Sequence, residues 1–291
     1  MGGVNNFGFG NDGIGAGHLI QVCLLSKYAR AISRNVGCGQ FGFPSFRVGL
    51  ATHYLSKGCF KLKYFVMLTI QGLKKSFGKN EVLRSIEMQC KPGEINGIVG
   101  VNGAGKSTLF QCIIGLQKAE GTVDWTGGII KNQSGLLPTD PPMLSRITGA
   151  EYLRLVTQAR GLEIADFQNH NIFDLPLERF VENYSTGMKK KIAFTGVLLQ
   201  KNDIFILDEP FNGLDLQSNL IVVEIIRRLK SMGKIILISS HIFSLLKDIC
   251  DQVHYLKDGR IDRVVSSGDF DQLEAVMTDA NFMNRVKNLD L

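Results

Sequence analysis

The stretch from Gly100 to Thr108 has the residue types and spacing that point most directly to chemistry. It fits the pattern G-x-x-x-x-G-K-[ST], in which glycines let the backbone close around phosphate oxygens while its amides point inward. Lys106 would then reach the β- and γ-phosphates of a nucleotide, and the hydroxyl of Ser107 would ligate Mg²⁺. The residues expected to surround the phosphates are Gly100, Val101, Asn102, Gly103, Ala104, Gly105, Lys106, Ser107 and Thr108. The pattern therefore predicts a nucleotide site.

Two adjacent carboxylates, Asp208 and Glu209, end an apolar stretch farther along the chain. Ligands of open α/β sheets bind at the carboxyl ends of the strands, so this pair would lie beside the bound phosphates. Asp208 would hold Mg²⁺ through water, and Glu209 would be the general base that orients the attacking water. Acidic residues also end strands at protein surfaces, and the pair indicates nucleotide hydrolysis because a phosphate loop precedes it.

These side chains can act together only if strands and helices bring them to one place, and the flanking sequence predicts such elements. Residues 95–99 form a short apolar run typical of a strand, and residues 109–114 have the pattern of a helix. Two further apolar runs, residues 203–207 and 234–240, are typical of buried strands, with a helical pattern at 216–232 between them. The alternation predicts an α/β fold.

A third motif, Tyr184-Ser-Thr-Gly-Met188, lies between the phosphate loop and the carboxylates. Ser185 is expected to cap a helix, and Gly187 to permit close approach of another backbone. With these motifs in this order, the chain from Met67 to its end resembles the nucleotide-binding subunit of ATP-binding-cassette (ABC) transporters, whose signature reads approximately L-S-G-G-Q. The sequence has Thr and Met where that signature has its first Gly and its Gln, and a Met there is similar to a subgroup of exporter cassettes.

The resemblance implies a P-loop NTPase core of the ABC-cassette type, with an antiparallel β subdomain and an inserted α-helical subdomain at about residues 140–196. It also implies ATP and Mg²⁺ as ligands and hydrolysis of ATP. Two copies would meet head to tail as a homodimer, so that Ser185 and Gly187 of one copy cap the ATP held by Lys106 of the other. The further partner would be a separate transmembrane permease, with the cassette bound peripherally at the cytoplasmic face of the membrane.

Three further residues match motifs of the same family. Phe77 matches the aromatic residue that stacks on adenine, Asp215 lies in a loop that would contact the opposite subunit, and His241 matches a switch histidine that contacts the γ-phosphate. Each also has a plain structural interpretation, as a core aromatic, a turn residue beside glycine or a histidine that ends a strand. We favour the switch role for His241 because it ends an apolar strand after Glu209, as the family pattern requires.

One position departs from the family pattern. The family usually has Gln, sometimes Glu, after the apolar strand that follows the phosphate loop, and this residue reaches Mg²⁺ and the attacking water. This chain has Thr139 there, followed by Asp140 and two prolines. Threonine is shorter and a weaker metal ligand, so we expect Thr139 through a bridging water, or Asp140, to substitute in part for the missing side chain.

Residues 1–66 differ in composition from the rest of the chain. They hold seven basic residues and a single acid, Asp12, and so carry the whole net charge of +6; the remainder has 26 basic and 26 acidic residues. The remainder therefore gives no electrostatic reason to expect nucleic acid as a partner.

This glycine-rich leader has three interpretations: a targeting segment, a basic segment on anionic lipid, or upstream sequence before a working protein that begins at Met67. We favour the third, with residues 67–291 as the ATPase domain, and N-terminal sequencing of the native protein would test it.

The leading functional hypothesis is an ATPase subunit that energises a membrane transporter. The alternative is a soluble ABC-type ATPase that acts on ribosomes, nucleic acid or a protein assembly. Ribosomal versions typically carry two cassettes in one chain, and DNA-repair versions carry long insertions or zinc-binding cysteines, whereas the six cysteines here include no C-x-x-C pair. A P-loop kinase is disfavoured because it would need neither the signature nor the histidine.

Overall fold

The computed structural model describes residues 67–241 and 243–270. The chain divides into two units, residues 1–61 and 62–291, and all described residues belong to the second. The expectations for the leader, residues 1–66, therefore lie outside the described residues. The last 25 or so residues have the sequence pattern of a polar-faced helix, and most of them also lie outside the described residues. Within the described ranges, no helix combines the length and the apolar character needed to cross a membrane.

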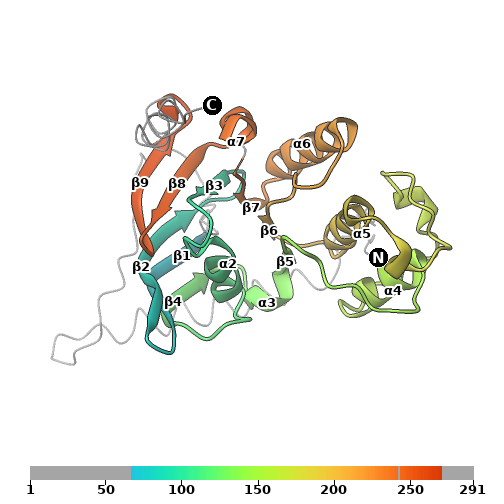
Figure 1. Cartoon of the computed structure of the whole chain (residues 1–291), viewed down its shortest axis with the longest axis horizontal. Coiled ribbons are helices and arrows are strands. Elements are labelled where there is room, and N and C mark those ends of the chain that lie inside the picture. Colours follow the sequence, from blue (N-terminus) through green and yellow to red (C-terminus); the bar gives the residue numbers. More distant parts are fainter. Residues whose placement is uncertain (1–66, 242, 271–291) are drawn as a thin grey trace, which may run out of the picture. The chain divides into compact units, whose positions relative to one another are not determined.

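A three-stranded antiparallel sheet forms the first part of the described chain (Figure 1). Its central strand is β1 (Leu68–Phe77), flanked by β2 (Asn80–Cys90) and β4 (Glu120–Trp125). Alternate residues of β1 and β2 are buried, so one face of the sheet packs against the core, as expected for an antiparallel sheet. The expected antiparallel subdomain is thus present.

A six-stranded sheet holds the predicted chemistry. Its spatial order is β5-β6-β7-β3-β8-β9, and all its strand pairs are parallel except β8 with β9. The strands are β3 (Ile95–Val99), β5 (Ser134–Leu137), β6 (Ile204–Asp208), β7 (Ile235–Ser239), β8 (Gln252–Lys257) and β9 (Arg260–Ser266). Every residue of β3, β6 and β7 is buried, which explains their nearly continuous apolar sequences.

The described residues form helices, several of which cover the two faces of this sheet. The helices are α2 (Lys106–Ile113), α3 (Ile130–Gln133), α4 (Gly149–Gln158), α5 (Thr186–Leu199), α6 (Leu216–Ser231) and α7 (Phe243–Ile249), with short 3-10 turns at Gln168–His170 and Val181–Asn183. One hydrophobic cluster joins α2 to both sheets, and another joins α5, α6 and α7 to the opposite face. The predicted α/β fold is confirmed.

The segment around α4 has a hydrophobic cluster of its own. Leu153 of α4 packs there with Ile192 of α5 and with apolar residues of the irregular chain between the two helices. A capping box starts α4, because Thr148 accepts a hydrogen bond from the Glu151 amide while the Glu151 carboxylate accepts one from the Thr148 amide. This separate cluster supports the expected helical subdomain at about residues 140–196, which stays a prediction.

Candidate nucleotide site

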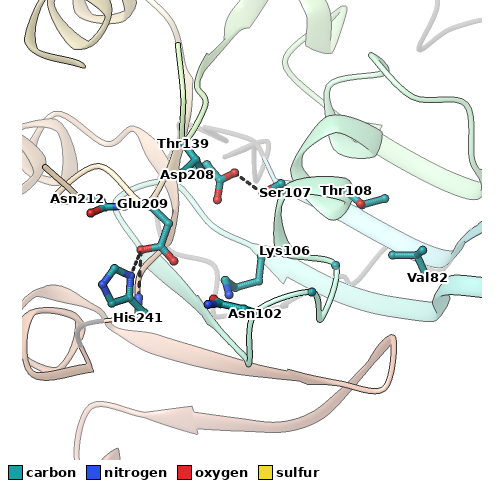
Figure 2. Close-up of a pocket in the computed structure, with 12 residues that line it drawn as sticks. Val82, Asn102, Lys106, Ser107, Thr108, Thr139, Asp208, Glu209, Asn212 and His241 are labelled. Carbon is teal, nitrogen blue, oxygen red and sulfur yellow. Dashed lines mark hydrogen bonds and ion pairs between the residues drawn. The ribbon is translucent and has the colours of Figure 1, made fainter. Parts of the chain in front are cut away.

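A cavity of about 650 Å³ lies where the chain leaves the carboxyl ends of β3, β6 and β7 (Figure 2). This is the edge at which a parallel sheet offers backbone and side-chain groups to a ligand. The lining residues are Val82, Asn102, Gly103, Gly105, Lys106, Ser107, Thr108, Thr139, Asp208, Glu209, Asn212 and His241. The structure therefore brings the loop, both carboxylates, the threonine and the histidine together.

The phosphate loop turns sharply into α2. Gly105 stands at the helix N-cap with a φ of 104°, a left-handed conformation that residues with a side chain rarely adopt. The Lys106 side chain is buried, and its Nζ donates to the carbonyl oxygens of Gly100 at 2.8 Å and Val101 at 3.4 Å. The ammonium thus lies within the loop that precedes it, next to the amides at the start of α2. This arrangement can hold an anion.

Ser107 and Asp208 meet across the cavity. The hydroxyl of Ser107 donates to Asp208 Oδ2 at 2.5 Å, and the hydroxyl of Ser239 donates to Asp208 Oδ1 at 2.6 Å. The second bond follows from strand register, because Asp208 of β6 and Ser239 of β7 are paired in the sheet. Both carboxylate oxygens are therefore fixed before any ligand binds.

The oxygen atoms at this place fit a magnesium ion. The hydroxyl of Ser107, the carboxylate of Asp208 and the hydroxyl of Thr139 belong to residues that line one cavity. Mg²⁺ in nucleotide sites takes one or two protein ligands and completes its shell with phosphates and water. Asp140 is exposed and does not line the cavity, so of the two expected substitutes Thr139 has the more suitable position.

Glu209 and His241 form a pair inside the cavity (Figure 2). The Glu209 carboxylate oxygen Oε2 is 2.8 Å from His241 Nδ1 and accepts a hydrogen bond of 3.1 Å from the His241 amide. The backbone of Glu209 has a φ of 52°, and a residue with a side chain in this left-handed region costs about 1–3 kcal/mol. Such strain persists only where neighbouring contacts hold it.

Sequence reasoning missed the residues that hold the main chain of Glu209. Its amide donates to Ser239 Oγ at 3.0 Å, and its carbonyl oxygen accepts from Lys190 Nζ at 2.8 Å and from the Asn212 amide at 3.2 Å. By sequence, the three consecutive lysines at 189–191 suggest a solvated helix face, but this interpretation is wrong at its centre, since Lys190 is only 2% exposed.

A signal for Lys190 was present in the sequence. It shares a helical face with Ala193, Phe194 and Val197, which are all buried, so the spacing of the apolar residues places this lysine on the buried stripe.

The signature residues lie outside the cavity lining. Ser185 is exposed and caps α5 as expected, its hydroxyl accepting from the Met188 amide at 3.2 Å. A Cβ at Gly187 would come 2.7 Å from the carbonyl oxygen of Gly213, so this glycine permits the close approach of the loop after β6. Any contact of these residues with a nucleotide stays a prediction.

Asp215 also lies outside the cavity and begins α6. It accepts a hydrogen bond from the Ser218 amide at 2.8 Å and forms an ion pair of 2.8 Å with Lys191 Nζ. The hydrogen bond from Lys191 is the main cause that lowers the pKa of Asp215, and the hydrogen bonds from Ser218 lower it further. Lys191 therefore ties the helix of the signature to the loop after Glu209.

Phe77 ends β1 and is 48% exposed, so its interpretation as a core aromatic is wrong. The Lys75 ammonium lies 4.7 Å from the ring centroid, a distance typical of a cation–π contact. Phe77 does not line the cavity, and its stacking on adenine stays a prediction.

Comparisons with known proteins agree with this geometry. The family model described as ABC transporter matches residues 83–212. The lantibiotic transport ATP-binding protein SrtF of Streptococcus pyogenes is 32% identical over 211 residues, which cover 67% of this chain and 89% of that protein. The uncharacterized ABC transporter ATP-binding protein YhaQ of Bacillus subtilis is 31% identical over 207 residues, covering 67% of this chain and 69% of YhaQ.

A solved structure gives the same result. The structure of an ATP-binding subunit of an ABC transporter matches with a TM-score of 0.66 and 28% identity, covering 76% of this chain and 98% of that one. The resemblance inferred from the motifs is thus confirmed by relatives that are matched over most of their length. The chain belongs to the ATP-binding subunits of ABC transporters, and it binds and hydrolyses ATP.

Proposed function

We propose that this ATPase energises transport through a separate membrane permease, working as a head-to-tail dimer at the cytoplasmic face of the membrane. The observation that carries the proposal is the meeting, in one cavity, of the Lys106 loop, the bonded pair Ser107 and Asp208, and the bonded pair Glu209 and His241. Together these groups provide for phosphate binding, metal binding and water activation.

Each of these groups has a role in the proposed hydrolysis of ATP. The ATP phosphates would bind the amides of the loop and the ammonium of Lys106. Ser107, with Asp208 and Thr139 acting through water, would hold Mg²⁺, which would supply positive charge beside the phosphates. Glu209 accepts a proton from the attacking water. At the same time the water oxygen bonds to the γ-phosphorus, and the bond from the γ-phosphorus to the β-phosphate oxygen breaks. The carboxylate is already directed into the cavity by its contacts with His241.

A second copy supplies what the cavity lacks. Ser185 and Gly187 do not line their own cavity, and Ser185 is exposed beside a helix N-terminus, where an anion is favoured. In a head-to-tail dimer these residues cap the ATP of the other copy. ATP then joins the two copies, and its hydrolysis lets them separate. The closed and the separated arrangement are the two states that would drive a permease.

Relatives support the permease partner. SrtF is by name a lantibiotic transport ATP-binding protein, and YhaQ is an ABC transporter ATP-binding protein. The segment around α4 exposes the apolar side chains of Leu155 and Phe180, which such a partner would cover.

Purification of the Glu209→Gln protein from detergent-solubilised membranes with Mg-ATP tests this proposal, with the wild-type protein in ADP as the control. We expect a polytopic membrane protein to co-purify in a stoichiometric amount. Recovery only with ribosomes, with nucleic acid or with no partner would contradict the permease-linked function and favour a soluble ATPase.

A further inference from the structure

Lys190 is a buried cation that the nucleotide chemistry described so far does not use. It lies on α5 with 2% of its surface exposed, and it does not line the cavity. Burial lowers its pKa. Its charged form is favoured by three nearby carboxylates, those of Asp140, Glu209 and Asp208. A buried ammonium is costly unless it has partners, so its place calls for an explanation in terms of what it contacts.

The contact of Lys190 is with the main chain of the general base. Its Nζ donates to the Glu209 carbonyl oxygen at 2.8 Å, a charge-assisted bond to the residue whose φ is 52°. The Glu209 amide is held at the same time by Ser239 Oγ, and the carboxylate by His241. Lys190 thus holds the carbonyl group of a strained residue. The amide and the carboxylate of that residue are held by Ser239, which ends β7, and by His241 just after it.

We propose that Lys190 is a positioning residue for ATP hydrolysis, which fixes the left-handed backbone of Glu209 so that its carboxylate stays in the cavity beside His241. This inference rests on the proposed role of Glu209 as general base. Because Lys190 does not line the cavity, its removal should slow the chemical step and leave ATP affinity unchanged. Ser185 is also the N-cap of the helix that carries Lys190, so a shift of the signature would reach Glu209 through this lysine.

The first test compares Lys190→Met, which keeps the length of the side chain without the ammonium, with Lys190→Arg, which keeps the charge. We expect Lys190→Met to lower kcat by about tenfold to 100-fold, as small misplacements of catalytic groups do, with the KM for ATP within about twofold of wild type. Lys190→Arg should restore part of the rate. The control is Lys201→Met, an exposed lysine just after α5, which should hydrolyse ATP normally.

A double-mutant cycle separates positioning from a general loss of structure. In the Glu209→Gln background, Lys190→Met should cause almost no further loss of rate, because the carboxylate that it positions is already gone. An equal loss in both backgrounds, or a raised KM with an unchanged kcat, would overturn the inference. Should Lys190→Met not fold, Lys190→Gln replaces it, and a wild-type kcat in that variant would equally overturn the inference.

The same cycle tells two failures apart. If Glu209→Gln is slow while the Lys190 variants hydrolyse ATP at the wild-type rate, only the role of Lys190 is wrong. If Glu209→Gln itself hydrolyses ATP at the wild-type rate, the proposed role of Glu209 is wrong and the positioning role is overturned with it.

Discussion

At the scale of single residues, Thr139 is the point at which this chain departs from its family while remaining in the cavity. The threonine side chain is shorter than that of the usual glutamine, and its hydroxyl is a weaker ligand for Mg²⁺. We expect Thr139→Gln to reach half-maximal ATPase activity at about tenfold less Mg²⁺, the change typical of altered metal surroundings. The measurement is ATPase rate against Mg²⁺ concentration, with Thr122→Gln, exposed on β4, as the control. An unchanged Mg²⁺ dependence would exclude a metal-linked role of Thr139.

His254 gives a prediction on stability instead of catalysis. It is buried on β8, with Nε2 3.3 Å from Asn96 Oδ1, and burial lowers its pKa to about 4. Its unfolded pKa is about 6.5, so the unfolded chain binds the proton more tightly, and stability is present above pH 6.5 and is lost as pH falls toward 4. From pH 7 to pH 5 this amounts to about 2 kcal/mol.

Urea unfolding of wild type and His254→Gln at pH 7 and pH 5 measures this effect. The free energy of unfolding of the wild type should fall more steeply with decreasing pH than that of the variant. Equal losses in the two proteins would show that His254 does not titrate as its burial indicates.

Sequence reasoning located the residues that belong to contiguous motifs and missed those that act through packing. The phosphate loop is recognisable because glycine, lysine and hydroxyl must follow one another at fixed spacing. Ser239 and Lys190 reach Glu209 only through strand register and a helical face, so their importance depends on tertiary contacts. The apolar stripe around Lys190 was the single local indication of its burial.

At the scale of elements, α5 is in close contact with the loop that joins β6 to α6. Gly187 approaches Gly213 O so closely that a Cβ would lie 2.7 Å away, and Lys191 pairs with Asp215. We expect Gly187→Ala to push the signature from this loop and to lower kcat by about tenfold or more. Binding of ATP to the monomer should not change, because Gly187 does not line the cavity.

ATPase rates and nucleotide titrations of Gly187→Ala check this prediction. Gly268→Ala is the matched control, since a Cβ there meets no atom within 4 Å and the glycine has no positive φ. A wild-type kcat in Gly187→Ala would mean that the loop can move away from residue 187 without loss of activity. The contact between Gly187 and Gly213 would then play no part in ATP hydrolysis.

The buried strands were predictable as elements because both of their faces are covered, which makes their sequences almost wholly apolar. Residues 146–160 have the pattern of a helix, but the helix in the structure is shorter, since the capping box at Thr148 starts α4 at Gly149 and the helix ends at Gln158. The sequence pattern alone indicates a strand over residues 68–73, whereas β1 continues to Phe77, because β2 pairs with it as far as Phe77 and β4 as far as Lys74. Such boundaries depend on partners that a local pattern does not contain.

At the scale of the whole molecule, the proposed function requires two copies. Each copy carries the phosphate loop, the proposed metal ligands and the proposed general base in one cavity, while Ser185 and Gly187 do not line that cavity. The family, and with it the ATPase activity, was predictable from the order of motifs, and the head-to-tail arrangement of two copies stays a proposal, supported by the position of Ser185 outside its own cavity. The role of the leader, residues 1–66, stays a prediction.

The most direct test of this central claim is the mass of the Glu209→Gln protein in solution, measured by light scattering with Mg-ATP and with Mg-ADP. Removal of a general base typically slows hydrolysis about 10²- to 10⁴-fold, so ATP should remain bound and hold two copies together. We predict a dimer in ATP and a monomer in ADP. A monomer in both nucleotides, or ATP hydrolysis at the wild-type rate, would contradict the account.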